Sequence, residues 1–453
     1  MITWSKRIFE ENNQNRLNLS TKLERKETNM ELLEKILDNQ NLFEAYKQVY
    51  ANKGASGIDG ITVEELGNYL FNNKEEIKDQ VRNRKYKPSP VRRVEIPKEN
   101  GKKRLLGIPT VVDRVLQQAI VQVLSPIFDE QFSNSSYGFR PNRSCEMAII
   151  RSLEIMNDGY DYIVDIDLER FFDTVNQDKL IGIIRKTVKD GEVVSLIMKF
   201  LQSGVMVNGL FQETKTGTPQ GGNLSPLLSN IMLNELDKEL EARGLNFTRY
   251  ADDTLIYVKS EKAAIRVMES ITTFIEKKLG LTVNVSKSKI SRPREIKYLG
   301  FGFYQNKQGE YRPKPHLKSV EKLKRKLNQL LKRSWSVSLD ERLLKLKQLI
   351  YGWVNYFKIA DMKKILTTMD SHMRRKIRAV IWKQWKLRKT RYKNLLKLGV
   401  NKDKARKAAW SSKSYWRISN ILAITVALSN DRLTKRGLVS LLTHYLKVHV
   451  QIN

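Results

Sequence analysis

Four aspartates stand in two apolar segments that are predicted to be β-strands. Asp165 and Asp167 belong to YDYIVDIDL, where strand alternation places both side chains on one face. Asp252 and Asp253 are adjacent in RYADDTLIYV, between aromatic and β-branched residues. Carboxylates in such surroundings are costly unless they are paired or bound to a cation. Carboxylates carried on strands can hold two divalent ions roughly 3.5–4 Å apart, as in-line phosphoryl transfer requires.

An adjacent pair of aspartates on its own is typical of an ordinary hairpin turn. The metal-site hypothesis is favoured here because a second acidic strand lies about 85 residues earlier in a strongly basic chain. A site with few oxygen ligands, completed by substrate phosphates, favours Mg²⁺. We therefore expect two Mg²⁺ ions, with Mn²⁺ as an alternative.

Composition excludes several other classes of protein. The chain has 453 residues, with 82 Lys and Arg against 49 Asp and Glu and a formal net charge of +33. Its single cysteine, Cys145, rules out an internal disulfide or a zinc site built from several cysteines. No apolar run reaches the roughly 18 residues of a membrane span, and the first residues lack the apolar core of a signal peptide. We expect a cytoplasmic protein of bacterial type without a membrane partner.

The excess positive charge is concentrated in the last third of the chain. Residues 1–310 contain 46 basic and 42 acidic side chains, whereas residues 311–453 contain 36 and 7. A run of charge is often only the solvated face of a helix. An excess of this size in a folded, tryptophan-rich segment is better explained by contact with a phosphate backbone. The sequence therefore predicts a nucleic-acid partner.

The elements that must position the aspartates are a mixture of strands and helices. Residues 92–109 read as a β-hairpin with Asn100-Gly101 at its turn. The helix that follows is expected to begin at Asp113 as its N-cap. Strands and helices alternate without a regular βαβ repeat, which predicts an α+β fold, and nearly everything beyond Lys314 is predicted to be helical.

Several motifs in order resemble the group II intron-encoded reverse transcriptases, or maturases, from about residue 30 to 445. Tyr250-Ala251-Asp252-Asp253 resembles the YxDD box of reverse transcriptases, and DLERFFDTV resembles the first catalytic box. The other matching blocks are NKGASGIDG, RRVEIPKENGKKRLLGIPTVVDRVLQQ, SYGFRPNRS, GTPQGGNLSPLLSNIMLNELD, NVSKSKI, YLGFGF, GWVNYFK, IWKQWK and KLGVNKDKARKAAWSSKSYWR.

The resemblance implies a right-hand polymerase fold with an all-α thumb and a small basic helical domain. The expected domains are an N-terminal extension over 1–29, fingers and palm over 30–310, a thumb or maturase X domain over 311–386, and a DNA- or RNA-binding module over 387–453. The chain lacks the cysteine pairs of an endonuclease module, so it resembles the endonuclease-free, bacterial class C-like branch.

The first catalytic carboxylate of the family falls on Asp167, because Phe172-Asp173 follows five and six residues later. Asp165 is then a neighbour rather than a ligand. Asp252 and Asp253 take the YxDD roles, and the backbone carbonyl of Leu168, or of a residue beside it, is expected to complete the metal site.

The resemblance also implies a set of nucleotide- and template-binding residues. Phe172, or Phe171 beside it, would lie under the sugar and exclude a 2′-hydroxyl, thereby selecting dNTPs. Lys287 could act as a general acid on the pyrophosphate. The residues expected to grip the triphosphate or the template are Lys98, Arg104, Arg140, Gln220 and Gly221.

The basic last third is expected to hold nucleic acid by its backbone and 2′-hydroxyls rather than by reading bases. The implied partners are an RNA template, a DNA primer, dNTPs, group II intron RNA and target DNA. The contacts are assigned to Arg374, Arg375, Arg378, Lys383 and Lys386.

Three functions are consistent with these features. The first is a Mg²⁺-dependent RNA-directed DNA polymerase that also assists intron splicing and retromobility. The second is an RNA-binding splicing cofactor without polymerase activity, although its aspartates are intact. The third is a reverse transcriptase recruited by its host for defence or repair. The first is favoured.

Overall fold

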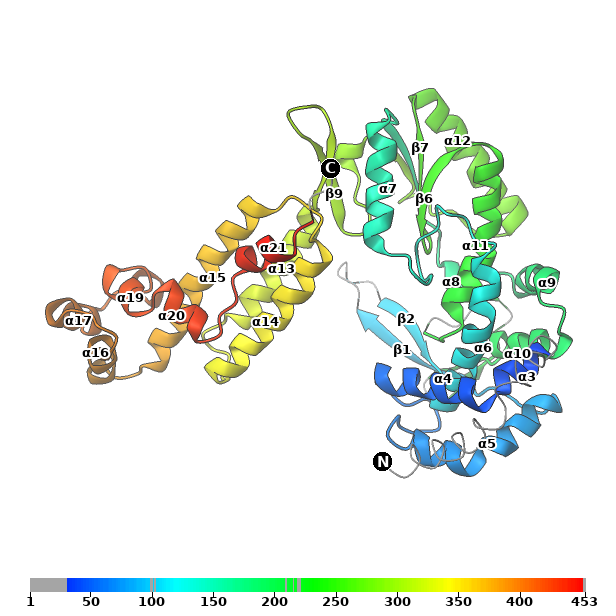
Figure 1. Ribbon diagram of the computed structural model, residues 1–453, viewed down its shortest axis with the longest axis horizontal. Helices are drawn as coiled ribbons and strands as arrows, with labels where there is room; N and C mark the ends of the chain where they lie inside the picture. Colours follow the sequence, from blue (N-terminus) through cyan, green and yellow to red (C-terminus); the bar gives the residue numbers. More distant parts are fainter. Residues whose placement is uncertain are drawn as a thin grey trace, which may run out of the picture. The chain divides into compact units, whose positions relative to one another are not determined.

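The computed structural model describes residues 31–97, 101, 103–207, 210–214, 216–217 and 221–450, so the predicted extension over 1–29 lies outside them. The chain divides into two compact units (Figure 1). Unit 1 contains the described residues up to 148 together with 160–290. Unit 2 contains residues 149–159 and the described residues from 291 onward.

The aspartates of the predicted metal site lie on a four-stranded sheet of strand order β6-β7-β3-β8. Both β6 and β3 pair with β7 in antiparallel fashion. Residues 254–258 of β7 are all buried, and helix α12 (Glu261–Phe274) packs against both β3 and β7. Strand bounds are β3 (Tyr162–Ile166), β6 (Asn246–Tyr250), β7 (Asp253–Val258) and β8 (Lys289–Ser291).

A second sheet in unit 1 has the order β2-β1-β4-β5. Strands β1 (Val91–Pro97) and β2 (Lys103–Ile108) form the antiparallel hairpin that the sequence predicts. Asn100 of its predicted turn lies outside the described residues. Strands β4 (Val205–Val207) and β5 (Leu210–Gln212) complete the sheet, with β4 parallel to β1.

The prediction that Asp113 caps the next helix is wrong. Helix α6 (Val111–Asp129) has Thr110 as its N-cap, and the Thr110 hydroxyl accepts a hydrogen bond from the Asp113 N–H at 3.2 Å. Asp113 lies inside the first turn, where its buried carboxylate accepts bonds from the Tyr86 hydroxyl and the Ser89 N–H. The carboxylate therefore fastens the helix to the preceding segment instead of capping it.

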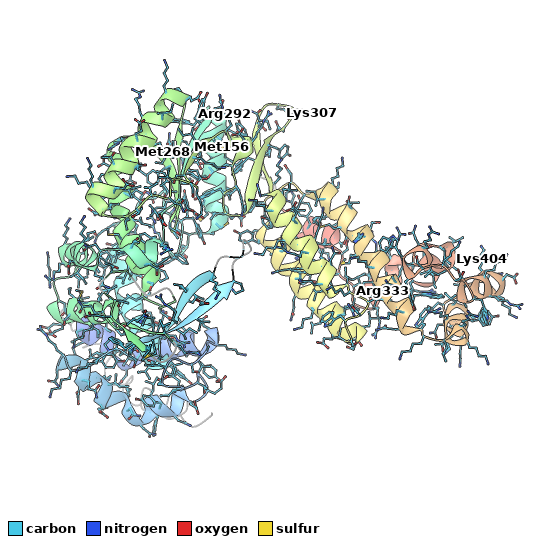
Figure 2. All side chains as sticks on the ribbon, turned by 180° about the vertical axis from the view of Figure 1, so that it is seen from behind. Met156, Met268, Arg292, Lys307, Arg333 and Lys404 are labelled. Atoms are coloured by element: carbon cyan, nitrogen blue, oxygen red, sulfur yellow. The ribbon has the colours of Figure 1, made fainter. Side chains whose placement is uncertain are left out.

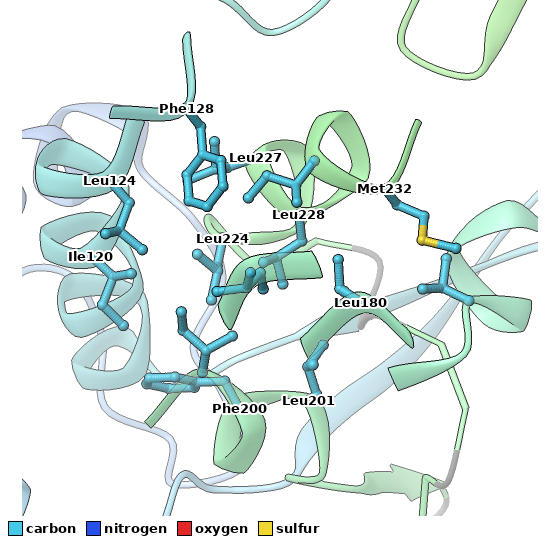
Figure 3. Packing of buried hydrophobic residues seen from close by; sticks show 14 of the residues in the cluster. Ile120, Leu124, Phe128, Leu180, Phe200, Leu201, Leu224, Leu227, Leu228 and Met232 are labelled. Atoms are coloured by element: carbon cyan, nitrogen blue, oxygen red, sulfur yellow. The ribbon is translucent and has the colours of Figure 1, made fainter. Parts of the chain in front are cut away.

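The core of unit 1 lies where α6 meets α11 (Ser225–Ala242). Figure 3 shows Ile120, Leu124 and Phe128 of α6 beside the leucines at 224, 227 and 228, all of them buried. The remaining helices of unit 1 are α3 (Leu32–Leu37), α4 (Asn39–Asn52), α5 (Leu66–Arg82), α8 (Phe171–Thr174), α9 (Gln177–Thr187) and α10 (Gly191–Leu201). Helix α11 also contacts β6, so this core adjoins the sheet β6-β7-β3-β8.

Unit 2 is helical beyond residue 315, as the sequence predicts. It begins with the antiparallel hairpin β9 (Phe301–Gln305) and β10 (Tyr311–Pro315), and α7 (Cys145–Asn157) contributes its residues from 149 onward. The other helices are α13 (Leu317–Leu330), α14 (Leu339–Tyr356), α15 (Lys363–Gln384), α16 (Arg388–Lys397), α17 (Lys402–Ala409), α18 (Tyr415–Ile418), α19 (Leu422–Ala427), α20 (Asn430–Lys435) and α21 (Leu441–Val448). In the part of the chain that the structure describes, no helix is both long and apolar enough to cross a membrane.

One buried carboxylate joins α15 to α21 within unit 2. Asp370 accepts hydrogen bonds from the Ser440 hydroxyl at 2.6 Å and from the N–H groups of Leu441 and Leu442 at 2.8 and 2.9 Å. It thereby satisfies backbone donors at the beginning of α21 that have no partner within the helix.

We predict that Asp370→Ala lowers the free energy of unfolding of unit 2 by about 2–3 kcal/mol, because buried donors lose their acceptor. Urea unfolding followed by tryptophan fluorescence measures this, since six of the seven tryptophans lie beyond residue 330. Asp431→Ala, which removes an exposed carboxylate from α20, is the matched control. Equal midpoints for the two variants would contradict the prediction.

Candidate active site

The YADD segment forms the turn between two paired strands. Tyr250 pairs with Asp253, so Ala251 and Asp252 make a two-residue hairpin turn, and Ala251 adopts a left-handed φ of 58°. In the neighbouring pair Ile166 lies opposite Thr254. Continuing this register by one residue places Asp167 opposite Asp253. The structure therefore brings Asp167, Asp252 and Asp253 together at one end of the sheet.

Asp167 is held by the segment 284–288. Its N–H donates to the Ser288 hydroxyl at 3.1 Å, and its carbonyl accepts from the Asn284 N–H at 2.8 Å. The Lys287 ammonium lies 2.8 and 2.9 Å from the two carboxylate oxygens of Asp167. Lys287, which the resemblance assigns to pyrophosphate, is therefore in direct contact with the carboxylate. Leu168 forms an isolated bridge with Val283 and is buried.

The carboxylates at this end of the sheet perturb one another. The pKa of Asp253 is raised to about 6. The chief cause is desolvation by the surrounding protein, although the residue still reaches solvent. The negative charges of Asp252, Asp165 and Asp167 raise the pKa further. Desolvation likewise raises the pKa of Asp165 to about 6, with Asp167 adding to it and Lys289 opposing it. Such crowding of negative charge is relieved by a bound cation.

The donor set fits divalent metal ions. It consists of carboxylate oxygens, which are the ligands that Mg²⁺ prefers, and the carboxylates are close enough to raise one another's pKa. Among the described residues no three acidic, histidine or cysteine side chains already stand in ligating positions. The Asp167 carboxylate is instead directed at the Lys287 ammonium.

The two phenylalanines of the first catalytic box lie in different environments. Phe171 is buried, whereas Phe172 is half-buried and packs edge-on against Phe171 with ring centroids 5.2 Å apart. Gly217 packs against the backbone here, since a Cβ at Gly217 would lie 2.7 Å from the Phe172 carbonyl oxygen. Phe172 is thus the ring that a ligand can reach.

The other residues predicted to bind nucleotide or template have different outcomes in the structure. Lys98 and Gln220 lie outside the described residues, and Arg104 is placed only as the strand partner of Ile96. At Gly221, with φ +113°, a Cβ would come within 2.4 Å of the Gly107 carbonyl oxygen, so a close backbone approach requires glycine.

Arg140 has a structural position rather than an open one. Its buried guanidinium donates to an Asp129 carboxylate oxygen at 2.6 Å and to the carbonyls of Ser133 and Ser136 at 2.5 and 2.9 Å. These bonds fix the loop between α6 and the GFRP segment. Because its guanidinium is engaged by these protein oxygens, Arg140 is not available for the template contact that the sequence predicts.

The predicted nucleic-acid-binding cations lie on α15 or just beyond it. Lys383 and Lys386 are exposed and Arg374 is half-buried. Arg375 stacks on the Trp416 ring, with its guanidinium carbon 3.8 Å from the ring centroid. Arg378 is buried and donates to the Leu428 carbonyl and the Asn430 side chain, so it joins α15 to the beginning of α20 rather than facing a ligand.

The sequence reasoning missed the residues that hold the YADD turn from behind. Arg249 and Asp237 are fully buried and form an ion pair, and Arg249 also bonds to Asn230. The available signal was an arginine in a strand immediately before the YADD turn, because a charged side chain that becomes buried is almost always paired.

Comparison with known proteins agrees with this arrangement. Residues 96–303 match the family "Reverse transcriptase (RNA-dependent DNA polymerase)", and residues 320–399 match "Group II intron, maturase-specific domain". Protein YkfC of Escherichia coli (strain K12) is 34% identical over 299 residues, covering 57% of this chain and 78% of YkfC. Group II intron-encoded protein LtrA of Lactococcus lactis subsp. cremoris is 39% identical over 212 residues, covering 47% of this chain but only 35% of LtrA.

The fold and the acidic site, together with the matched family, define an RNA-directed DNA polymerase with the right-hand fold and a helical second part. Polymerases of this kind depend on divalent metal and act on nucleic acid. The chain belongs, more narrowly, to the group II intron-encoded reverse transcriptases. The predicted family, fold class and enzyme class are thereby confirmed.

Proposed function

We propose that this chain copies RNA into DNA by two-metal nucleotidyl transfer, with Asp167, Asp252 and Asp253 holding two Mg²⁺ ions. The observation that carries the proposal is the strand register, which places these three residues at one end of a sheet. The Leu168 carbonyl is the proposed backbone ligand. When bound, the metal pair lowers the pKa of an attacking hydroxyl and neutralises the leaving phosphate.

The protein's own residues would orient the nucleotide around this centre. The accessible ring of Phe172 would lie under the sugar, and Gly221 would let the backbone approach the nascent base pair. Lys287 would hold a proton close to the pyrophosphate, because its ammonium already lies beside the Asp167 carboxylate. Lys98, Arg104 and Gln220 keep their predicted roles in binding triphosphate or template.

We further propose that unit 2 binds the RNA template, the DNA primer and target DNA by their backbones, and group II intron RNA in support of splicing and retromobility. The match to a maturase-specific domain and the excess of 36 basic over 7 acidic residues beyond residue 310 support this. Exposed cations such as Arg333 and Lys404 project from its surface (Figure 2). The proposed contacts are Arg374 and Lys383 on α15 and Lys386 just beyond it, because Lys383 and Lys386 are exposed, whereas Arg375 stacks on Trp416 and Arg378 is buried. The Lys383 ammonium also donates to the Arg333 carbonyl at 3.1 Å.

We predict that Asp252→Ala reduces primer extension on an RNA template with dNTPs and Mg²⁺ by at least about 1,000-fold, because charge neutralisation of this kind is a large part of catalysis. Binding of the primer–template is expected to stay within about twofold, since surface cations dominate it. If wild type does not extend the primer but binds intron RNA tightly, the chain is a splicing cofactor without polymerase activity. If it extends primers but binds no intron RNA, a host role in defence or repair is favoured.

Replacing the ring of Phe172 tests its place beneath the sugar. We expect Phe172→Val to raise rNTP incorporation relative to dNTP on the order of 10-fold or more, because removal of the ring makes room for a 2′-hydroxyl. Phe172→Tyr keeps the ring and is expected to preserve the discrimination. Single-nucleotide insertion with dNTP and rNTP measures both, and unchanged selectivity in the valine variant would refute the assignment.

The basic surface is tested by its salt dependence. We expect Lys383→Ala with Lys386→Ala to reduce the slope of log K against log [KCl] by about 1.5, because each lost phosphate contact releases fewer counterions. Fluorescence anisotropy with a labelled RNA–DNA duplex measures the slope. The control pair, Lys238→Ala with Lys262→Ala, removes two exposed helix lysines from unit 1 and should leave the slope unchanged. Equal slopes for both pairs would argue against this surface.

A further inference from the structure

A buried ion pair lies directly behind the YADD turn. Arg249 is the fourth residue of β6 and Asp237 lies on α11, and neither side chain reaches solvent. The guanidinium binds the carboxylate in a forked arrangement, with Nε to Oδ1 at 2.7 Å and Nη2 to Oδ2 at 2.5 Å. This geometry fixes the plane of the guanidinium and leaves Nη1 directed elsewhere.

The free end of the guanidinium is directed at the turn itself. Its Nη1 donates to the carbonyl oxygen of Ala251 at 3.0 Å and to Asn230 Oδ1, also at 3.0 Å. Ala251 immediately precedes Asp252 and has a left-handed φ of 58°. A non-glycine residue in that region costs of order 1 kcal/mol and persists only where the surroundings hold it.

A second segment, residues 135–138, also contacts the residues of this turn. Asn230 Nδ2 donates to the Gly138 carbonyl at 2.8 Å, which joins α11 to this segment. The backbone of Arg249 also pairs with it, donating to the Ser135 carbonyl at 2.9 Å and accepting from the Tyr137 N–H at 2.8 Å. A Cβ on Gly138 would lie 2.3 Å from the Ala251 nitrogen, so the contact is close enough to exclude any side chain.

Stability alone is a poor explanation for this arrangement. Burying two charges costs several kcal/mol per ion, and replacing such pairs by apolar residues is often neutral or stabilising. What an apolar replacement could not supply is a rigid donor aimed at the Ala251 carbonyl. The ion pair is therefore better explained by the Ala251 carbonyl that it holds than by a contribution to the free energy of unfolding.

We propose that Arg249, oriented by Asp237 and Asn230, is a positioning residue that holds the Ala251 carbonyl and thereby sets where Asp252 presents its carboxylate. It touches neither substrate nor metal and acts through the turn. The inference rests on the proposed function, because it assumes that Asp252 is a metal ligand.

The test measures metal binding in a complex that cannot react. The full chain is assembled with an RNA template, a dideoxy-terminated DNA primer and the next dNTP, and Mn²⁺ affinity is read from the electron paramagnetic resonance signal of free Mn²⁺. Arg249→Lys keeps the charge facing Asp237 but lacks the fork that reaches Ala251. We expect it to weaken Mn²⁺ binding about 10-fold, and Asn230→Ala about 3- to 5-fold, as loss of hydrogen bonds of this kind implies.

The matched control is Arg342→Lys in unit 2. Arg342 is equally buried and donates to the carbonyls of Leu330, Lys332 and Trp335, far along the chain from the turn. It is expected to lower the melting temperature while leaving Mn²⁺ affinity as in wild type. The two arginine variants therefore separate positioning from structural support.

Each outcome decides a different point. Wild-type Mn²⁺ affinity in Asp252→Asn overturns the proposed metal site itself. Loss of affinity in Asp252→Asn, with wild-type affinity in a folded Arg249→Lys, overturns the positioning role alone. If Arg249→Lys does not fold, Asn230→Ala decides: a lowered melting temperature with unchanged Mn²⁺ affinity means that the network is structural only.

Discussion

Several carboxylates, each partly removed from water, lie close together at one end of the sheet β6-β7-β3-β8, and the surrounding structure depends on this constraint. Desolvation first, and then the repulsion between these carboxylates, raises the pKa of Asp165 and of Asp253 to about 6, above the values of an unfolded chain. Because a raised carboxylate pKa makes ionisation unfavourable in the folded state, stability contributed by these groups falls as the pH rises through about 6. Bound cations reverse this penalty. The protein itself provides two positive charges here, the ammonium groups of Lys287 and Lys289.

The carboxylates of the proposed site and the excess of positive charge lie in different parts of the chain. An acidic centre repels a phosphate backbone, and a dense field of lysine and arginine competes with divalent ions for carboxylates. Here the carboxylates of the proposed site lie in residues 1–310, where charge is nearly balanced, and the excess of positive charge lies beyond residue 310. In unit 2, Arg375 stacks on Trp416 and Arg333 stacks on Tyr415. These cation–π contacts stabilise arginine side chains in a region of high positive charge.

Local features were predictable from the sequence, and tertiary pairings were not. The strands that carry the aspartates and the hairpin β1–β2 depend on neighbouring residues, and the structure has both. The cap of α6 was assigned to Asp113 because the sequence does not reveal that Tyr86 and Ser89 bind its carboxylate. The roles of individual site residues stay predictions, since position alone does not establish what a side chain binds.

Arginine explains why counting positive charge overstates the surface available to nucleic acid. Its planar fork has five donors and can satisfy several carbonyl oxygens at once, which lysine cannot do. Arg140, Arg249 and Arg378 all use it in this way, and their charge faces protein oxygens. An arginine next to other cations in the sequence can therefore belong to the scaffold. Burial, which only the fold reveals, leaves Arg374, Lys383 and Lys386 as the predicted contacts that still reach solvent, although the Lys383 ammonium also donates to the Arg333 carbonyl.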